Sequence, residues 1–213
     1  MKTYLFDFDG TLVDSMPSYI GVMLRILDEH EIKYEKDIIK IITPLGYQGT
    51  ANYFRELGID EPVNELVLRM QRYAQNEYEN KIEAKEGVIE TLLELKRIGA
   101  NLNVLTASPH SMLDPCLKRL GIWELFDNIW SCDDFGTTKS EPKIYREVAK
   151  KIGQRVGEII FVDDNINAVK TAKIAGMKSY GIYDESSRDF IDEMKKEADY
   201  YIENFKDLIK YYK

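Results

Sequence analysis

The chain has 213 residues with 29 basic and 37 acidic side chains, which gives a net charge of −8 at neutral pH. This charge repels phosphate backbones and anionic membrane surfaces, and so argues against nucleic acid or a membrane as a partner. The hydrophobic fraction of 44% and the charged fraction of 31% are typical of a folded globular protein, and the length suits one large domain or one domain with an insertion.

The expected cellular location is the cytoplasm. The two cysteines, Cys116 and Cys132, are too few for a disulfide framework, so we expect reduced thiols. The N-terminus meets Asp7 and Asp9 before any apolar run long enough for the core of a signal peptide. No later run approaches the length of a membrane span, and nothing in the sequence requires more than a monomer.

The first strand is expected at Tyr4–Phe6, a short apolar run that ends at acidic residues. After Ser15 the apolar residues recur at helical spacing, and this pattern continues to about Asn80 with little sign of strands. Turns are expected near 33–37, 43–49 and 58–62, where glycine, proline and polar residues gather. Residues 15–80 are therefore predicted to form a small helical unit.

From Gly87 onward, predicted helices and strands alternate. The apolar runs that read as strands are Leu102–Leu105, Ile129–Cys132, Ile159–Val162, Lys178–Tyr183 and a short Tyr200–Ile202. The helical patterns between them are Val88–Ile98, Met112–Leu120, Pro142–Ile152 and Asn167–Ala175. This alternation predicts an α/β fold in three layers, a Rossmann-like and mostly parallel sheet with helices on both faces. Residues 1–14 and 81–213 would form this core, with residues 15–80 inserted after the first strand.

Polar residues follow four of these strands, and the carboxyl ends of parallel strands share one edge of a sheet. These residues are Asp7 and Asp9 after the first strand, Thr106 after the second, Lys139 beyond the third, and Asp163 with Asp164 after the fourth. Crowded carboxylates raise one another's pKa unless a cation compensates. Magnesium suits such oxygen ligands, whereas zinc does not fit, because His30 and His110 stand apart from any histidine or cysteine cluster.

The nine residues Asp7–Ser15, which read DFDGTLVDS, resemble the first motif of the haloacid dehalogenase superfamily. The resemblance is to its phosphatase and phosphomutase branch, which includes phosphoglycolate phosphatase and beta-phosphoglucomutase. Thr106, the segment Lys139–Pro142 and the segment Phe161–Asp164 resemble the second, third and fourth motifs in the right order. The resemblance covers nearly the whole chain.

This resemblance implies a role for each motif residue. Asp7 would attack the substrate phosphorus and form an aspartyl-phosphate, because a carboxylate is ionised at neutral pH without an activating base. Asp9 would protonate the leaving oxygen and then activate water. Gly10 would let the backbone approach the phosphate closely, and Thr106 and Lys139 would bind its oxygens.

The resemblance also implies a magnesium site made of Asp7, the backbone carbonyl of Asp9, and Asp164. Asp163 would be either a further ligand or a partner of the ligands. Two positions depart from the common pattern. Ala168 stands where many members carry another acid, and Ser140 replaces the proline that usually follows the lysine.

Four further positions are open to more than one interpretation, and they are Lys143, Ser108, His110 and Tyr19. Lys143 competes with Lys139, which we prefer because it precedes Pro142, a residue typical of a first helical turn. Ser108 is expected to cap a helix, His110 to lie in an exposed loop, and Tyr19 to pack in the interior.

Residues 15–80 resemble the helical cap that such enzymes close over their substrate. The turn 44–49 could reach the site with Tyr47 and Gln48 as substrate contacts, or it could be an ordinary connection between helices.

The predicted function is a magnesium-dependent phosphatase acting on a small phosphorylated metabolite. A sugar-phosphate mutase is the alternative, although it would need a basic residue for a second phosphate and Thr43–Thr50 contains none. A dehalogenase would not need Asp9 or the metal ligands. A binding protein without turnover would be expected to have a broken site, and all four motifs are intact. Phosphoglycolate, sugar phosphates and nucleotides all remain possible substrates.

Overall fold

The computed structural model describes residues 2–212 and divides into two compact units. The first unit contains the chain up to Asp14 and the chain from Glu83 onward, and the second contains Ser15–Ile82. The sequence predicted the boundary between residues 80 and 81, and the structure places it two residues later, between Ile82 and Glu83.

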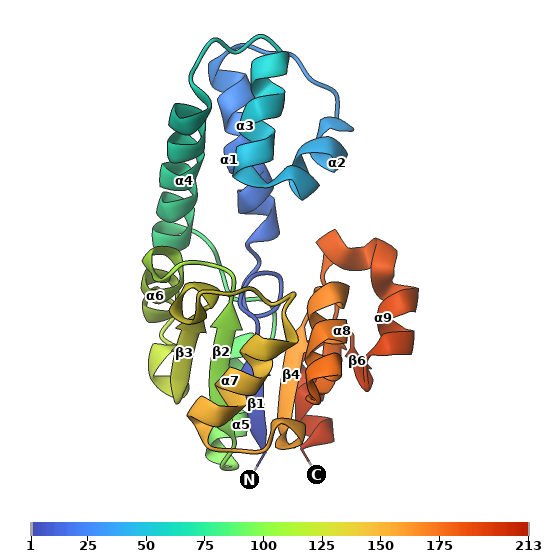
Figure 1. The fold of residues 1–213 in the computed structure, drawn as a ribbon. Helices are drawn as coiled ribbons and strands as arrows, with labels where there is room; N and C mark the ends of the chain where they lie inside the picture. The colour runs from blue at the N-terminus through green and yellow to red at the C-terminus, as the bar shows by residue number, and fades with distance from the viewer. Residues whose placement is uncertain (1, 213) are drawn as a thin grey trace. The chain divides into compact units, whose positions relative to one another are not determined.

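The first unit is built on a six-stranded sheet with the strand order β3-β2-β1-β4-β5-β6, in which every neighbouring pair is parallel (Figure 1). Its strands are β1 (Thr3–Phe6), β2 (Asn101–Thr106), β3 (Asn128–Ser131), β4 (Ile159–Asp163), β5 (Lys178–Ile182) and β6 (Tyr200–Ile202). Each predicted strand is present, with ends that differ from the prediction by at most one residue.

Strand β1 occupies the centre of the sheet, and all four of its residues are buried. Phe6 is in register with Val104 of β2 on one side and with Val162 of β4 on the other. The chain order runs outward from β1 in both directions, so the β1–β4 pair is where the order reverses. In open parallel sheets, ligands bind outside the carboxyl ends of the strands at such a reversal.

Helices cover both faces of the sheet, as the sequence predicted. They are α5 (Val88–Arg97), α6 (His110–Arg119), α7 (Pro142–Ile152), α8 (Ile166–Ala175) and α9 (Ile191–Glu197). Helices α7 and α8 lie over one face of the sheet (Figure 1). On that face Leu5 and Phe161 pack with residues of these helices, and the ring of Tyr145 meets that of Phe161 edge-on at 5.1 Å between centroids. On the opposite face the ring of Phe6 lies 5.7 Å from that of Phe205. The three-layer α/β fold is therefore confirmed.

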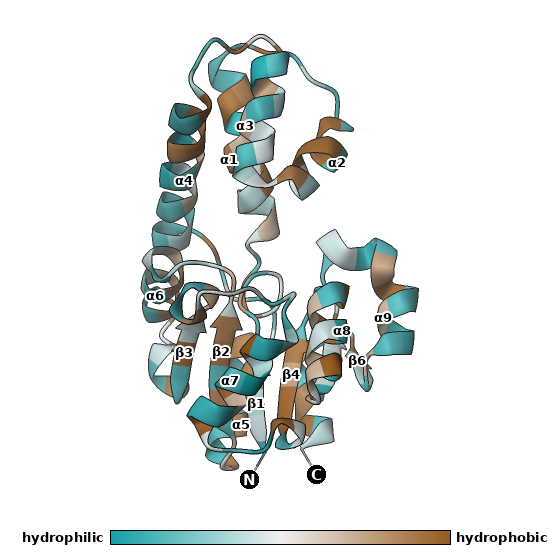
Figure 2. Cartoon of the chain, in the orientation of Figure 1, coloured by the Kyte–Doolittle hydropathy of each residue, from teal (hydrophilic) through white to brown (hydrophobic). Residues whose placement is uncertain are grey.

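Burial of apolar side chains explains these layers. Strand β4 is strongly hydrophobic up to Val162 and ends in an aspartate, whereas α7 carries hydrophilic residues on its outer side (Figure 2). Helix α7 places Ile144, Tyr145, Val148 and Ala149 toward the core at intervals of three and four residues.

The second unit is helical and has its own core. It contains α1 (Met16–Glu29), α2 (Ile38–Ile42), α3 (Gly46–Glu56) and α4 (Val63–Asn80). Its buried side chains come from all four helices, and they include Met23, Ile42, Phe54 and Met70.

The turn expected at residues 43–49 is present only in its first part, because α2 ends at Ile42 but residues 46–49 are helical. Thr43–Leu45 forms a short 3₁₀ helix, and α3 begins directly at Gly46. Gly46 supplies a positive φ of 64° at this junction. At Gly49 a Cβ would lie 2.9 Å from the Cβ of Leu45, so this glycine permits the close approach of the preceding segment rather than marking a loop.

Within residues 2–212, we find no helix with both the length and the apolar character needed to cross a membrane.

Candidate active site

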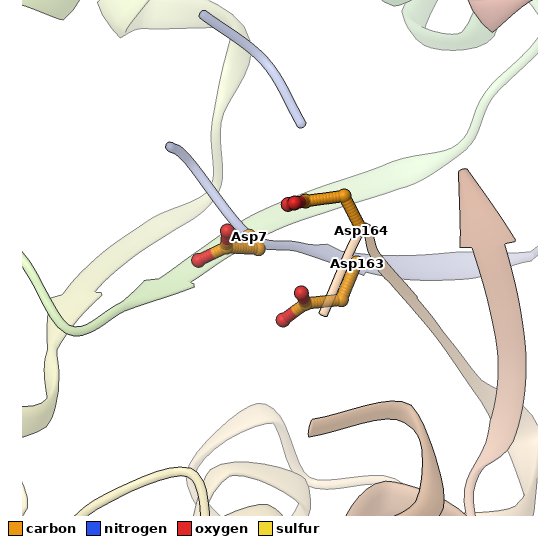
Figure 3. A group of neighbouring side chains, drawn as sticks. All are labelled: Asp7, Asp163 and Asp164. Atoms are coloured by element: carbon orange, nitrogen blue, oxygen red, sulfur yellow. The ribbon is translucent and has the colours of Figure 1, made fainter. Parts of the chain in front are cut away.

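Three acidic side chains meet at the carboxyl ends of β1 and β4. Asp7 follows β1 directly, Asp163 is the last residue of β4, and Asp164 follows it. One carboxylate oxygen from each lies within 4.8 Å of the others, and all three side chains are buried. The three carboxylates project to the same side of the strand ends (Figure 3).

Lys139 brings a positive charge into this group. Its Nζ lies 2.6 Å from Asp7 Oδ1 and 2.8 Å from Asp163 Oδ2. The hydroxyl of Tyr145 donates to the Lys139 carbonyl at 2.9 Å, which fixes the loop that carries the lysine. Lys143 is instead exposed on α7 and pairs with Glu147 at 3.4 Å. The geometry therefore places Lys139, and not Lys143, among the carboxylates.

The two neighbouring acids of β4 have different partners. Asp163 accepts from Lys139 at one oxygen and from the backbone N–H of Asn165, at 2.7 Å, at the other. Asp164 accepts from the hydroxyl of Thr11 at 3.1 Å, and its own backbone N–H donates back to that hydroxyl at 3.2 Å. Because both oxygens of Asp163 are bonded within the protein, Asp164 has the greater capacity left for a cation.

Burial and mutual repulsion act strongly on this group. Burial raises the pKa of Asp7 well above its ordinary value; Lys139 opposes this shift, while Asp163 and Asp164 add to it. Burial, with Asp163 and Asp184 beside it, raises the pKa of Asp164 to about 7. Burial alone would lower the pKa of Lys139, but Asp163 and Asp7 hold it well above its ordinary value. One ammonium against three carboxylates leaves an excess of negative charge that a bound cation would relieve.

The residues present therefore fit a hard divalent cation. Carboxylate oxygens are the ligands that magnesium prefers, and a bound cation would counteract the burial and the neighbouring acids that raise the pKa of Asp7 and Asp164.

Asp9 and the end of β2 face one another across the sheet edge. The hydroxyl of Ser108 donates to Asp9 Oδ2 at 2.5 Å, and the backbone N–H of Ser108 donates to Thr106 Oγ1 at 3.0 Å. The expected helix cap by Ser108 is wrong, because Pro109 is the residue that precedes α6 and no side chain caps that helix. Thr106 is fully buried at the end of its strand.

His110 does not lie in a loop, so that expectation is also wrong. It is the first residue of α6, and its side chain is 40% exposed. Its Nδ1 lies 2.7 Å from Asp114 Oδ1 and its Nε2 lies 2.9 Å from Asp134 Oδ2. Hydrogen bonds to Asp114 and Asp134 raise the pKa of this imidazole.

Tyr47 and Gln48, the two suggested substrate contacts, belong to the second unit. Both lie in the first turn of α3, where Gln48 is exposed and Tyr47 is partly buried. The ring of Tyr47 packs against that of Tyr19, with 5.2 Å between centroids, and Tyr19 thus packs as expected. Their contact with substrate stays a prediction.

Sequence reasoning missed several residues that hold the site together. Asp184 follows β5 by two residues, so the rule that strand ends converge could have found it. Thr11 stands inside the first motif and carries a hydroxyl, which was a usable signal. No signal in the sequence marked Lys85, because it lies just past the helical insertion in a segment without periodicity.

Comparison with known proteins shows the family of the chain. The model of the haloacid dehalogenase-like hydrolases matches residues 4–182. The chain belongs to the haloacid dehalogenase-like hydrolase family. This confirms the resemblance of the four motifs, and it makes the protein a hydrolase.

One curated relative is the pyrophosphatase PpaX of Bacillus velezensis, 31% identical over 182 residues, which cover 84% of this chain and 81% of the relative. The enzyme class expected from the sequence was a phosphoric monoester hydrolase, and the family together with this relative's name supports a phosphatase.

Solved structures share the fold. One, described as a beta-phosphoglucomutase from Thermotoga maritima, matches with a TM-score of 0.84 at 21% identity and covers 99% of this chain and 98% of its own. The hydrolase YfnB of Bacillus subtilis, bound to magnesium, matches with a TM-score of 0.82 at 17% identity and covers 99% of this chain and 97% of its own.

Proposed function

We propose that the protein is a magnesium-dependent phosphatase that hydrolyses a small phosphate monoester through an aspartyl-phosphate on Asp7. The observation that carries the proposal is the buried group of Asp7, Asp163 and Asp164, with ligand oxygens within 4.8 Å of one another and Lys139 bonded to two of the three. Such a group combines a nucleophile, a cation site and a phosphate-binding ammonium at one strand-end edge.

The first half-reaction transfers the phosphoryl group to the protein. A carboxylate oxygen of Asp7 forms a bond to phosphorus while the bond from phosphorus to the leaving oxygen breaks. Asp9 gives its proton to that oxygen, and the Ser108 hydroxyl at 2.5 Å fixes the carboxyl that does so. Lys139, together with the hydroxyl and N–H groups at the strand ends, offsets the charge on the transferring oxygens.

The second half-reaction releases phosphate. Asp9, now ionised, takes a proton from water, and the resulting oxygen attacks the phosphorus of the aspartyl-phosphate. The bond from phosphorus to Asp7 breaks and restores the free carboxylate.

Magnesium would be held by Asp7, Asp164 and the backbone carbonyl of Asp9. Asp163 would act indirectly, by orienting Lys139, because both of its oxygens are already bonded. When bound, the ion supplies positive charge that offsets the repulsion between the phosphate and these acids.

The second unit, Ser15–Ile82, would act as the cap that selects the substrate. Its segment Thr43–Thr50 contains no basic residue, which favours hydrolysis over transfer between sugar phosphates that carry a second phosphate. The name of the relative PpaX adds inorganic pyrophosphate to the candidate substrates.

The test is a phosphate-release assay with pyrophosphate, phosphoglycolate, sugar phosphates and nucleotides, with and without magnesium. Wild type is compared with Asp7→Asn and with a control, Asp189→Asn, whose side chain is 88% exposed. We expect Asp7→Asn to lose activity by on the order of 10³-fold or more at preserved folding, and the control to match wild type.

Acid-quenched wild-type protein should also carry one extra phosphoryl group by intact-mass spectrometry, and Asp7→Asn should not. An Asp7→Asn variant with wild-type turnover would remove Asp7 as the nucleophile. Transfer of phosphate to a sugar phosphate, without net release, would favour the mutase.

A further inference from the structure

A buried ion pair outside the four motifs connects to the first of them. Lys85 Nζ donates to the Gly10 carbonyl at 2.6 Å, to the Tyr183 carbonyl at 2.6 Å and to Asp184 Oδ2 at 2.8 Å. The side chains of Lys85 and Asp184 are 18% and 6% exposed. An ammonium has three N–H donors, so each is used once, and the lysine joins the first motif to the end of β5.

Gly10 is the residue that brings the first motif against Asp164. Its φ is +75°, and a Cβ placed there would lie 2.8 Å from both carboxylate oxygens of Asp164. The next residue, Thr11, exchanges two hydrogen bonds with Asp164. The position of this turn therefore controls where the Asp164 carboxylate lies.

Lys85 is well placed to fix that turn, because its backbone is also bonded to the first motif. Its N–H donates to the Leu12 carbonyl at 3.0 Å, and the N–H of Asp14 donates to the Glu83 carbonyl at 3.0 Å. Side chain and backbone thus hold Gly10 and Leu12 from one residue.

The charges of Lys85 and Asp184 do not by themselves explain the role of this ion pair beside Asp164. Asp184 raises the pKa of Asp164 and Lys85 lowers it, so the two charges act on the metal-binding acid in opposite directions. What the pair supplies is a fixed geometry at the Gly10 carbonyl. Buried charges of this kind are stable only when paired and hydrogen-bonded, as these are.

We propose that Lys85, held by Asp184, is a positioning residue that fixes the Gly10 turn against Asp164 and thereby sets the affinity of the site for magnesium. The inference rests on the proposed function, in which Asp164 binds the ion. Partners behind a metal ligand commonly change metal affinity by about 10-fold to 100-fold when they are removed.

The test uses the double variant Lys85→Met/Asp184→Asn. It removes one positive and one negative charge together, so the net charge near the site is unchanged and no buried carboxylate is left unpaired. The amide oxygen introduced by Asp184→Asn can still accept from Ser186, whose N–H donates to Asp184 Oδ1 at 2.9 Å in the wild-type protein. We expect the dissociation constant for Mg²⁺, measured by titration calorimetry, to rise about tenfold.

A matched control is Lys96→Met/Asp127→Asn. The two side chains of this pair are 2.7 Å apart, but Asp127 lies directly before β3, at the opposite edge of the sheet from β6. We expect its Mg²⁺ affinity to equal that of wild type. A double variant at Lys85 and Asp184 with unchanged affinity, at a wild-type circular dichroism spectrum, would overturn the inference.

The single variant Lys85→Met separates geometry from charge. Loss of a positive charge should by itself strengthen the attraction for Mg²⁺, whereas loss of the link to Gly10 should weaken binding. We expect weaker binding, which charge cannot produce. The variant Asp184→Asn keeps Lys85 bonded to Gly10, so its affinity for Mg²⁺ should fall less than that of the double variant. An equal loss of affinity in the two variants would count against the link through Lys85.

A second measurement does not depend on the metal. Amide hydrogen exchange in metal-free protein should be faster at Gly10, Leu12 and Val13 in the double variant than in wild type, because the turn is no longer held. Equal exchange would overturn the inference. If wild type and Asp164→Asn bind Mg²⁺ equally, the proposed metal site fails, and hydrogen exchange still decides whether Lys85 holds the turn.

Discussion

Lys139 shows how single residues balance charge in this site. Its ammonium is the partner of both Asp7 and Asp163, at 2.6 and 2.8 Å, in a group where all three side chains are largely shielded from water. Removing one member of a buried ion pair leaves an uncompensated charge, which costs about 3–5 kcal/mol. The same residue would bind the transferring phosphate, so stability and catalysis both depend on it.

We therefore predict two effects of Lys139→Met. The free energy of unfolding should fall by about 3 kcal/mol in the absence of magnesium, as measured by urea denaturation. The value of kcat/KM for phosphate release should fall by roughly 10²-fold to 10³-fold, because a donor to the transferring oxygens is lost. Lys143→Met is the control, since Lys143 is 74% exposed, and both quantities should stay close to wild type. Equal losses in the two variants would remove the special role of Lys139.

Asp164 leads to a prediction about pH and metal binding. Its pKa is about 7 without metal, because of burial and the neighbouring acids. In the proposed function magnesium binds the ionised carboxylate, so below pH 7 the ion would have to displace a proton. The apparent dissociation constant for Mg²⁺ should rise about fivefold from pH 7 to pH 6.

Calorimetry in buffers of different ionisation enthalpy would detect this proton directly. The observed heat at pH 6 should vary with the buffer, and at pH 9 the variation should be smaller. A dissociation constant that does not change between pH 6 and pH 8 would contradict the prediction.

Helix α7 positions the site through its tyrosine. Tyr145 packs on Phe161 of β4, and its single hydroxyl proton is shared between the carbonyl of Lys139, at 2.9 Å, and that of Ala168 in α8, at 3.2 Å. One side chain thus connects the sheet, a neighbouring helix and the loop that carries the lysine.

Tyr145→Phe should keep the packing and lose these hydrogen bonds. We predict a loss of about 1–2 kcal/mol in the free energy of unfolding, because two buried carbonyls lose a partner. Turnover should fall severalfold as the Lys139 loop becomes less ordered. The control is Tyr201→Phe, since the Tyr201 hydroxyl is buried without a hydrogen-bond partner among residues 2–212. That variant should be neutral or slightly stabilising, and a Tyr145→Phe variant that behaves like it would contradict the prediction.

The elements of the first unit could be predicted because periodicity and strand ends carry strong signals. Buried strands are short apolar runs, and the acidic residues after β1 and β4 mark the edge where they meet. Contacts that depend on side-chain direction could not be predicted. Ser108 precedes a proline and a helix, a pattern typical of a cap, yet its hydroxyl reaches Asp9.

The same limit applies to the segment around Gly49 and to Lys85. Glycine and proline near Gly49 suggested a loop, but this glycine instead permits the close approach of Leu45 in the preceding 3₁₀ helix. Lys85 resembled any surface lysine, because its three acceptors come from parts of the chain that are distant in sequence. Long-range geometry of this kind leaves no trace in local composition.

At the scale of the whole molecule, the acidic site is predicted to make stability depend on pH and, through the proposed magnesium site, on metal. A folded-state pKa of about 7 for Asp164, against about 3.9 in the unfolded chain, means that the folded protein binds more protons between these values. Stability should therefore fall as pH rises from about 4 to 7, and level off above 7. Asp7, whose pKa is also raised, acts in the same direction.

We predict that the unfolding temperature of metal-free protein decreases from pH 5 to pH 7, with up to about 1.4 kcal/mol of stability lost per pH unit for each such proton. Saturating magnesium should reverse the trend, because the ion binds only the folded, ionised site and binds it better at higher pH. Asp164→Asn is the control: it removes the proton but retains the contribution of His110, whose pKa is also raised. Thermal scans at pH 5, 6 and 7 with chelator should show a smaller slope in this variant than in wild type. Equal slopes in the two proteins would contradict the prediction that Asp164 takes up a proton on folding between pH 5 and pH 7.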